Sequence, residues 1–145
     1  MKLIIQRVKN ASVEVKNEIV GKIGQGFLVL LGVGPEDTNE TVNFLVQKLV
    51  KLRIFEDSNQ KMNLNIKDVN GELLIVSQFT LYADCSSGNR PSFTNAAEPI
   101  KANKLYEYFI EKCKLENIKV EHGIFGEDMQ VKLLNDGPVT IILEK

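Results

Sequence analysis

The feature that most constrains the fold is the longest apolar run of the chain, Phe27–Val33, which is followed directly by Gly34-Pro35. Seven residues is the length of a buried strand and falls far short of the roughly 18–20 residues that a membrane-spanning helix needs. Glycine followed by proline ends regular structure, because such a pair favours a turn. The sequence therefore predicts a globular domain built around a buried strand.

The chain length and composition favour a single domain over residues 1–145. A chain of 145 residues with 43% hydrophobic residues can bury a core without disulfides or metals. The first seven residues carry charge but no apolar core, so they do not resemble a signal peptide. The two cysteines, Cys85 and Cys113, lie too far apart for a metal or redox motif. We expect reduced thiols, a cytoplasmic location, no membrane association, and no metal or other cofactor.

Several short strands are expected in the first half of the chain. Leu3–Val8 is predicted as a first strand, and the alternation over Ala11–Val15 predicts a second, half-exposed strand. Asn70-Gly71 is a strong hairpin signal, and it is expected to join a strand near Asn65–Val69 to the apolar strand Leu73–Val76.

Two helices are expected. Asp37 followed by Glu40 resembles a capping box and predicts a helix that ends near Phe55. Pro99 is expected to begin a second helix. The first helix carries apolar residues at helical spacing (Val42, Leu45, Val46, Leu49 and Leu52), and so does the second (Ala102, Leu105, Tyr106, Phe109, Ile110 and Cys113).

The C-terminal part alternates again at the period of strands. Ile118–Ile124 and Met129–Leu133 are predicted strands, and Asn135–Pro138 is a predicted turn into a last strand, Val139–Leu143. Short turns between strands favour an α+β domain with a compact, mostly antiparallel sheet and two helices. Closure of this sheet into a barrel is compatible with the pattern.

Three polar segments are candidates for chemistry. Ser77–Leu81 places hydroxyls and an amide at the end of an apolar strand. Asn135–Thr140 contains a Gly-Pro pair that can aim a carbonyl oxygen rigidly. Gly88–Phe93 holds Arg90 in a loop, where it can meet a phosphate or a carboxylate. Each segment also has a structural explanation: capped backbone groups, an ordinary trans-proline turn, and a solvated arginine.

The sequence lacks the usual catalytic groups. His122 is the only histidine, and its alternation with Ile118 and Ile124 predicts a partly buried structural role. Neither cysteine has the setting of an activated nucleophile, and no carboxylates are grouped at a metal-ligand spacing. The net charge of −1 argues against extensive electrostatic binding of duplex nucleic acid but permits recognition of a short single-stranded end.

Taken together, these segments resemble the D-aminoacyl-tRNA deacylase family, whose signatures Ser-Gln-Phe-Thr-Leu and Asn-x-Gly-Pro-x-Thr stand complete at Ser77–Leu81 and Asn135–Thr140. The resemblance covers essentially the whole chain in order. The other matching segments are Gln6-Arg7-Val8, Ala11-Ser12-Val13, Leu30–Val33, Arg53-Ile54-Phe55, Lys61–Leu64, Gly88–Phe93 and Asp128–Val131.

The resemblance implies a homodimer with a β-barrel-like fold that acts on the 3′ end of aminoacyl-tRNA. It implies that the Gly137–Pro138 bond is cis and that this turn enters the active site of the partner subunit. There its carbonyl oxygens would meet the ammonium group of the substrate and exclude an L side chain, which is specificity by repulsion. D-amino acids, and glycine mischarged on tRNA(Ala), would be hydrolysed in this chiral proofreading step.

The resemblance also implies a catalytic group of Ser77, Gln78, Phe79 and Thr80, with chemistry assisted by the RNA. The 2′-OH of the terminal adenosine would help to activate water, and backbone N–H groups of Phe79 and Thr80 would hold the oxyanion. Gln78 would lie near the scissile carbonyl. The remaining expectations are an adenosine pocket formed by Phe125 and Met129, and a phosphate contact from Arg90.

Departures and alternatives accompany this hypothesis. Ser86-Ser87 stands where many relatives carry basic residues, which weakens the expected grip on the acceptor stem. One alternative is a nucleic-acid-binding module without catalysis, as proposed for some relatives in DNA replication. Another is a Ser/Thr esterase with a covalent acyl intermediate on Ser77 or Thr80.

Overall fold

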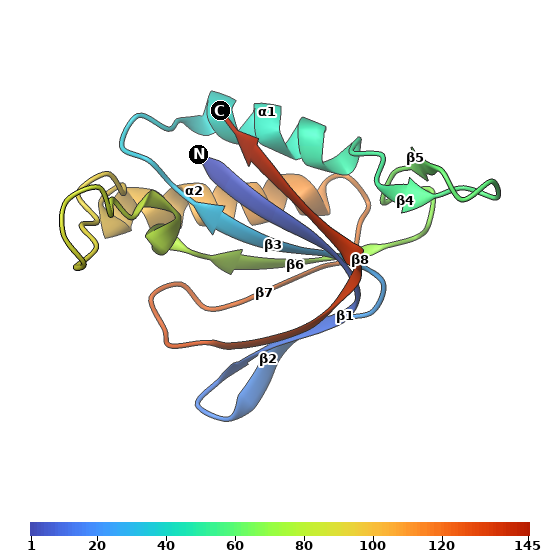
Figure 1. Ribbon diagram of the computed structural model, residues 1–145, viewed down its shortest axis with the longest axis horizontal. Helices are drawn as coiled ribbons and strands as arrows, with labels where there is room; N and C mark the ends of the chain where they lie inside the picture. The colour runs from blue at the N-terminus through green and yellow to red at the C-terminus, as the bar shows by residue number, and fades with distance from the viewer.

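The computed structural model describes all residues, 1–145, as an α+β domain with a curled sheet and two helices (Figure 1). The strands of the main sheet are β1 (Lys2–Val15), β2 (Glu18–Ile23), β3 (Gly26–Gly32), β6 (Glu72–Ser77), β7 (Val120–His122) and β8 (Gln130–Glu144). The remaining elements are α1 (Asn39–Val50), α2 (Pro99–Lys114), the small sheet of β4 (Phe55–Glu56) and β5 (Met62–Leu64), and the 3₁₀ turn η1 (Phe79–Tyr82).

The main sheet is mixed, so the expectation of a mostly antiparallel sheet was not confirmed. Its order is β2-β1-β3-β6-β7, and β8 pairs with β1. β1 runs antiparallel to β2, β3 and β8, whereas β6 runs parallel to both β3 and β7. The reason lies in the connections, because α1 lies between β3 and β6 and α2 lies between β6 and β7. A crossover that contains a helix returns the chain in a parallel direction.

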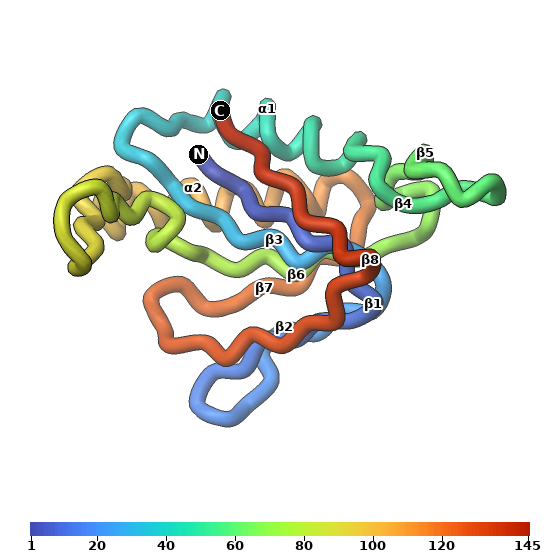
Figure 2. Tube along the Cα trace, viewed as in Figure 1, coloured from blue at the N-terminus to red at the C-terminus, as the bar shows by residue number.

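The curl of the sheet nearly closes a barrel, as the sequence pattern allowed. β2 and β7 stand at opposite ends of the strand order, yet they approach each other closely. A Cβ atom on Gly21 of β2 would lie only 3.0 Å from the carbonyl oxygen of His122 in β7. Figure 2 shows the two termini side by side along β1 and β8, where the Met1 ammonium donates to the Lys145 carbonyl at 2.7 Å.

Both helices cover one face of the sheet. The larger apolar core joins this face to α1 and α2, and it contains the whole predicted stripe of α2. A smaller cluster fills the concave side of the curl, with Val8, Ala11, Val13, Ile23, Leu28, Leu74 and Val76. β3 and β6 therefore contribute to both clusters, which confirms Phe27–Val33 as a strand buried on both faces. Neither helix is both long and apolar enough to cross a membrane.

The N-terminal strands differ from the prediction. Leu3–Val8 and Ala11–Val15 form one continuous strand, β1, because Lys9 and Asn10 stay extended between them. β2 was not predicted. It follows a two-residue turn in which Lys16 and Asn17 both have left-handed backbone angles, with φ of 51° and 67°. Positive φ at both central residues is the signature of a tight hairpin turn.

The first helix begins one residue later than predicted and ends earlier. Thr38 is its N-cap residue, and Asp37 instead accepts hydrogen bonds from the Met1 ammonium and the Gly34 N–H. The helix ends at Val50 rather than near Phe55. Phe55 is buried all the same, because its ring stacks on Phe27 with 5.0 Å between centroids.

The predicted hairpin at Asn70-Gly71 was wrong. Asn65–Val69 forms turns, and β6 lies between the parallel strands β3 and β7 with no antiparallel partner. The side chain of Asn65 accepts backbone hydrogen bonds from Lys67 and Asp68, which is the chemistry of an Asx turn rather than of a strand.

Candidate functional site

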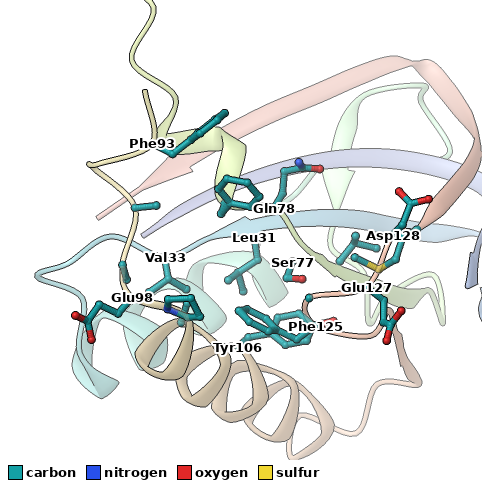
Figure 3. A pocket seen from close by; sticks show the side chains of 18 of the residues that line it. Leu31, Val33, Ser77, Gln78, Phe93, Glu98, Tyr106, Phe125, Glu127 and Asp128 are labelled. Atoms are coloured by element: carbon teal, nitrogen blue, oxygen red, sulfur yellow. The ribbon is translucent and has the colours of Figure 1, made fainter. Parts of the chain in front are cut away.

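A cavity of about 740 Å³ opens where β6 ends. η1 and the loop after it form one wall, and α2 with the segment after β7 forms the other (Figure 3). The lining is mainly apolar, with a few polar groups at the edge. The lining residues are Leu31, Val33, Val76, Ser77, Gln78, Phe79, Phe93, Ala96, Ala97, Glu98, Pro99, Ala102, Tyr106, Phe125, Gly126, Glu127, Asp128, Met129 and Val131.

Ser77, Gln78 and Phe79, at the end of β6, lie in the wall of this cavity. The Gln78 N–H donates to the Leu31 carbonyl at 2.8 Å, which holds the end of β6 against β3. The chain then turns into η1, where the first N–H groups of a short helix have no acceptor inside the helix. These N–H groups belong to Phe79 and Thr80.

Thr80 does not line the cavity, although it contacts a residue that does. Its hydroxyl oxygen accepts a hydrogen bond of 2.5 Å from the side-chain amide of Gln78. This contact fixes the orientation of the Gln78 side chain at the mouth of the cavity. An amide cannot take up a proton from a hydroxyl at neutral pH, so Gln78 cannot activate Thr80 as a nucleophile.

The opposite wall contains Phe125 and Met129, the two residues expected to form an adenosine pocket. The Phe125 ring packs against Tyr106 of α2, with 6.0 Å between centroids. The Tyr106 hydroxyl donates to the Ile75 carbonyl at 2.9 Å and lies 3.2 Å from the Gly123 carbonyl. Burial raises the pKa of Tyr106 well above its usual value, so its hydroxyl stays a neutral donor that ties α2 to the sheet.

Gly137 and Pro138 lie in a bulge of β8 rather than in a chain-reversing turn, so the predicted division of this segment into two strands was wrong. Thr140 pairs with Gln6 and Asn135 pairs with Val8, which leaves residues 136–139 opposite a single residue of β1. Both bulge residues are exposed, the peptide bond between them is cis, and Gly137 has a φ of +135°. A Cβ on Gly137 would lie 2.7 Å from Cγ2 of Val139, so only glycine fits there.

The residue opposite the bulge is Arg7, and its side chain is buried. Its Nε donates to the Asp136 carbonyl at 2.9 Å, and one terminal nitrogen donates to the Ile54 carbonyl at 2.6 Å. The Asp136 carboxylate lies 3.5 Å away and the Glu56 carboxylate 3.8 Å away. Arg7 therefore joins the bulge to the segment after α1.

A second contact closes the bulge from within. The Asn135 side-chain oxygen accepts the Val139 N–H at 2.7 Å, and its amide nitrogen lies 3.2 Å from the Thr140 hydroxyl. Asn135 and Thr140 are the end residues of the segment singled out in the sequence, and their types are explained by this bracing.

Sequence reasoning did not single out Arg7 as a functional residue. The available signal was its place in the alternation of the strand, because Arg7 lies on the same face of β1 as the buried residues Leu3 and Ile5. An arginine in a row of core positions predicts a buried charge with dedicated partners.

The structure does not bring every predicted site residue together. Gly137 and Pro138 lie beside Arg7, which is in register with Phe27 of β3 and Leu73 of β6, whereas the cavity lining in β6 begins at Val76. Three residues of strand separate Leu73 from Val76, which is roughly 10 Å at the rise of a strand. In Figure 1 the bend of β8 and the loop after η1 lie at opposite ends of the sheet. Arg90 is exposed in that loop and does not line the cavity.

The only histidine and both cysteines lie apart from the cavity lining. His122 is exposed rather than partly buried, because β7 ends at this residue, and its Nδ1 lies 2.8 Å from the Gly123 carbonyl. Cys85 is exposed and Cys113 is buried. Burial raises the pKa of the Cys113 thiol to about 12. No group of three His, Cys, Asp or Glu side chains is placed to hold a metal ion.

Comparison with known proteins gives consistent results over the whole chain. The family model described as D-Tyr-tRNA(Tyr) deacylase matches residues 4–144. A curated D-aminoacyl-tRNA deacylase of Thermosipho africanus is 59% identical over 99% of this chain and 97% of its own length. A second one, from Thermosipho melanesiensis, is 56% identical with the same coverage.

Solved structures show the same fold. A structure described as c-Myc DNA unwinding element binding protein superimposes with a TM-score of 0.93 at 41% identity, over 100% of this chain and 99% of that one. A probable eukaryotic D-amino acid tRNA deacylase gives a TM-score of 0.83 at 18% identity, over 98% of this chain and 97% of that one, and supports the fold alone. With a family model that spans residues 4–144 and relatives this similar over their full length, the chain belongs to the D-Tyr-tRNA(Tyr) deacylase family.

Proposed function

We propose that this protein hydrolyses the ester between a D-amino acid and the 3′ end of tRNA. The observation that carries the proposal is the cavity at the end of β6, where Ser77, Gln78 and Phe79 face an aromatic and apolar wall. Its volume of about 740 Å³ lies within the range of small-molecule sites, and it suits an aminoacyl-adenosine rather than a duplex. The net charge of −1 agrees with recognition of such an end.

In this proposal, water attacks the ester carbonyl and the N–H groups of Phe79 and Thr80 hold the oxyanion. One such donor contributes roughly 2.7–4 kcal/mol to the stability of a transition state. Gln78, held by Thr80, orients the carbonyl. The 2′-OH of the terminal adenosine assists the water, because the wall of Ser77, Gln78 and Phe79 has no histidine or carboxylate. The carboxylates of the lining, Glu98, Glu127 and Asp128, belong to the start of α2 and to the segment after β7. The adenine ring packs between Phe125 and Met129.

Chiral selection is assigned to the bulge at Gly137 and Pro138, acting in the cavity of a second copy. Within one chain the bulge and the cavity lie at different levels of the sheet, so the bulge serves a neighbouring cavity better than its own. Large apolar side chains are exposed on either side of the bulge, Leu134 at 52% and Ile142 at 64%. They supply an apolar surface for a homodimer around the bulge. Carbonyl oxygens of the bulge would meet the substrate ammonium and exclude an L side chain.

The deciding experiment compares the purified, metal-free protein on D-Tyr-tRNA and L-Tyr-tRNA at micromolar enzyme. We expect release of D-tyrosine while the L-ester stays intact, and we expect glycine to be released from Gly-tRNA(Ala) as well. An intact D-ester under these conditions would refute the proposed activity. Because the substrate is a charged tRNA, the proposal includes a cytoplasmic location.

A covalent route through Ser77 or Thr80 makes a different prediction. It requires an acyl-enzyme, which adds the mass of the amino acid to the protein during turnover. We expect no such adduct in acid-quenched samples, because the Thr80 hydroxyl is paired with an amide rather than a base. An adduct on either residue would replace the RNA-assisted route with the covalent one.

Binding to DNA is a second candidate, raised by the 41% identical structure described as a DNA unwinding element binding protein. Measuring duplex affinity as a function of salt tests it. A steep loss of affinity with salt, in a protein that leaves D-Tyr-tRNA intact, would favour this function.

A further inference from the structure

Two aromatic side chains remain exposed at the rim of the cavity. Phe79 is 57% exposed and Phe93 is 38% exposed, although both residues line the cavity. Their rings meet edge to face, with 4.9 Å between centroids and 68° between planes. Figure 3 shows Phe93 at the end of the cavity farthest from Tyr106 and Phe125. The rim pair, Phe79 and Phe93, is therefore a preformed aromatic surface that no part of the chain covers fully.

The position of Phe93 is fixed on both sides. Before it, Asp84 and Ser92 exchange two backbone hydrogen bonds of 2.8 and 2.9 Å, which close the loop that carries Arg90. After it, the Ala97 N–H donates to the Val33 carbonyl at 2.9 Å and anchors the chain to the end of β3. The exposed position of Phe93 is therefore fixed by backbone hydrogen bonds on both sides of the residue.

On the basis of the proposed function, we propose that the rim pair stacks against the base of the nucleotide that precedes the terminal adenosine. When the adenosine occupies the wall of Phe125 and Met129, the single-stranded end of the tRNA must leave the cavity across its rim. Single-stranded RNA is recognised largely by stacking of bases on aromatic side chains, whatever the base. Arg90, three residues before Phe93 in the same loop, provides a cation for the adjoining phosphate.

The test compares three D-tyrosyl esters: full tRNA, tRNA with an abasic penultimate nucleotide, and the single nucleoside D-tyrosyl-adenosine. The variant is Phe93→Leu, which keeps an apolar side chain and removes the aromatic face. Its matched control is Phe44→Leu on α1, because Phe44 is similarly exposed at 42% and does not line the cavity. Thermal melting of both variants checks that they fold.

We expect Phe93→Leu to raise KM for D-Tyr-tRNA by roughly 5- to 150-fold with little change in kcat, which is the effect of losing one stacked base. The abasic tRNA should show the same rise in KM with the unmodified protein and no additional rise with the variant. KM for D-tyrosyl-adenosine should stay within about twofold of the unmodified value in the variant, because this ester has no penultimate base to stack. Phe44→Leu should match the unmodified protein on all three esters.

An equal loss on all three esters would show that Phe93 shapes the cavity, and it would overturn the proposal. A loss that depends on the amino acid, such as D-tyrosine against glycine, would assign the rim pair to the aminoacyl side chain and would also overturn it. Binding of uncharged tRNA with a fluorescent cytidine analogue at the penultimate position is a readout independent of hydrolysis. If the unmodified protein quenches this probe and Phe93→Leu does not, the stacking proposal is supported. This result does not depend on whether the protein deacylates D-Tyr-tRNA.

Discussion

Arg7 keeps its guanidinium out of water while it donates to two backbone carbonyls, those of Asp136 and Ile54. Burial of an arginine costs free energy unless its donors are satisfied. A bulge of four residues in turn needs contacts from outside the bulge to keep a single conformation. At the scale of single residues, Arg7 is the link between the geometry of the bulge and the core.

Replacing Arg7 by methionine tests this link. The variant leaves the Asp136 and Ile54 carbonyls without their donor, so we expect unfolding to become easier by about 3 kcal/mol and deacylation to fall at least tenfold. Lys9→Met is the control, because Lys9 contacts the same Asp136 at 3.7 Å from a side chain that is 65% exposed. Urea unfolding and kcat/KM report the two effects. Equal behaviour of the two variants would contradict the bracing role.

Gly137→Ala tests the shape of the bulge itself. A φ of +135° is strained for alanine, and the added methyl group would lie 2.7 Å from Cγ2 of Val139. We expect a stability loss of roughly 1–3 kcal/mol together with loss of D-Tyr-tRNA hydrolysis, because the distorted bulge no longer directs its carbonyl oxygens at the substrate ammonium. Gly24→Ala serves as the control, since a methyl group added there would meet nothing within 4 Å. Hydrolysis of D-Tyr-tRNA by Gly137→Ala at the unmodified rate, with the L-ester still intact, would remove the bulge from the selection step.

At the scale of elements, the sequence predicted α2 well and α1 only in part. α2 begins at Pro99 as predicted, and its apolar stripe stays regular from Ala102 to Cys113, with every member buried. In α1 the spacing continues to Leu52, so the pattern alone does not reveal that the helix ends at Val50. Ile54 and Phe55 are buried outside the helix, and hydrophobicity cannot distinguish a buried loop residue from a buried helical one.

The residues of the candidate site were likewise predicted only in part. Polar residues at the end of an apolar strand marked Ser77 and Gln78, because such a strand end is visible in the sequence. Tyr106 was assigned only to the core, and Phe93 only to a loop, since nothing local indicates that both reach one cavity. The parallel placement of β6 between β3 and β7, which creates this cavity, depends on contacts far apart in the chain.

The burial of Cys113 on α2 gives a chemical test of this element. Burial raises the pKa of its thiol to about 12, so below that pH the folded protein holds almost none of the reactive thiolate. We expect iodoacetamide at pH 8 to add one group to the native protein, at the exposed Cys85, and two in denaturant. Intact mass measures the count, and Cys85→Ser should give no native adduct. Rapid double labelling without denaturant would contradict the packing of α2.

The same thiol affects stability at alkaline pH. The unfolded chain loses the Cys113 proton near its ordinary pKa, whereas the folded chain keeps it up to about 12. Between these values the unfolded state binds fewer protons, so the free energy of unfolding falls as pH rises. Replacing Cys113 by alanine should flatten this part of the stability profile, as urea unfolding from pH 8 to 11 would show. A profile equally steep in the variant would assign the effect to other groups.

At the scale of the whole molecule, the proposed function requires two chains for one working site, because bulge and cavity are separated within one chain. This predicts complementation between two inactive variants. Gly137→Ala keeps an intact cavity and Gln78→Ala keeps an intact bulge, so a heterodimer of the two carries one complete site. After co-refolding in equal amounts we expect about a quarter of the unmodified activity, since half of the dimers would be mixed and each would hold one such site.

The control for complementation is either variant refolded alone, which should remain inactive. Size-exclusion chromatography with light scattering should show a dimer in each case. Activity that stays at the level of the single variants, in samples shown to contain mixed dimers, would place bulge and cavity in the same chain.

The bulge of β8 also limits which changes of length this protein can tolerate. Beyond the bulge, Val139, Ile141 and Leu143 turn toward the core while Thr140, Ile142 and Glu144 stay outside. Removing one residue from 136–138 either breaks the bracing by Arg7 and Asn135 or slips the strand by one position. A slip would exchange the two sets of side chains and leave the core against Thr140 and Glu144. Single-residue insertions and deletions in this segment should therefore prevent correct folding, whatever their effect on the choice of substrate.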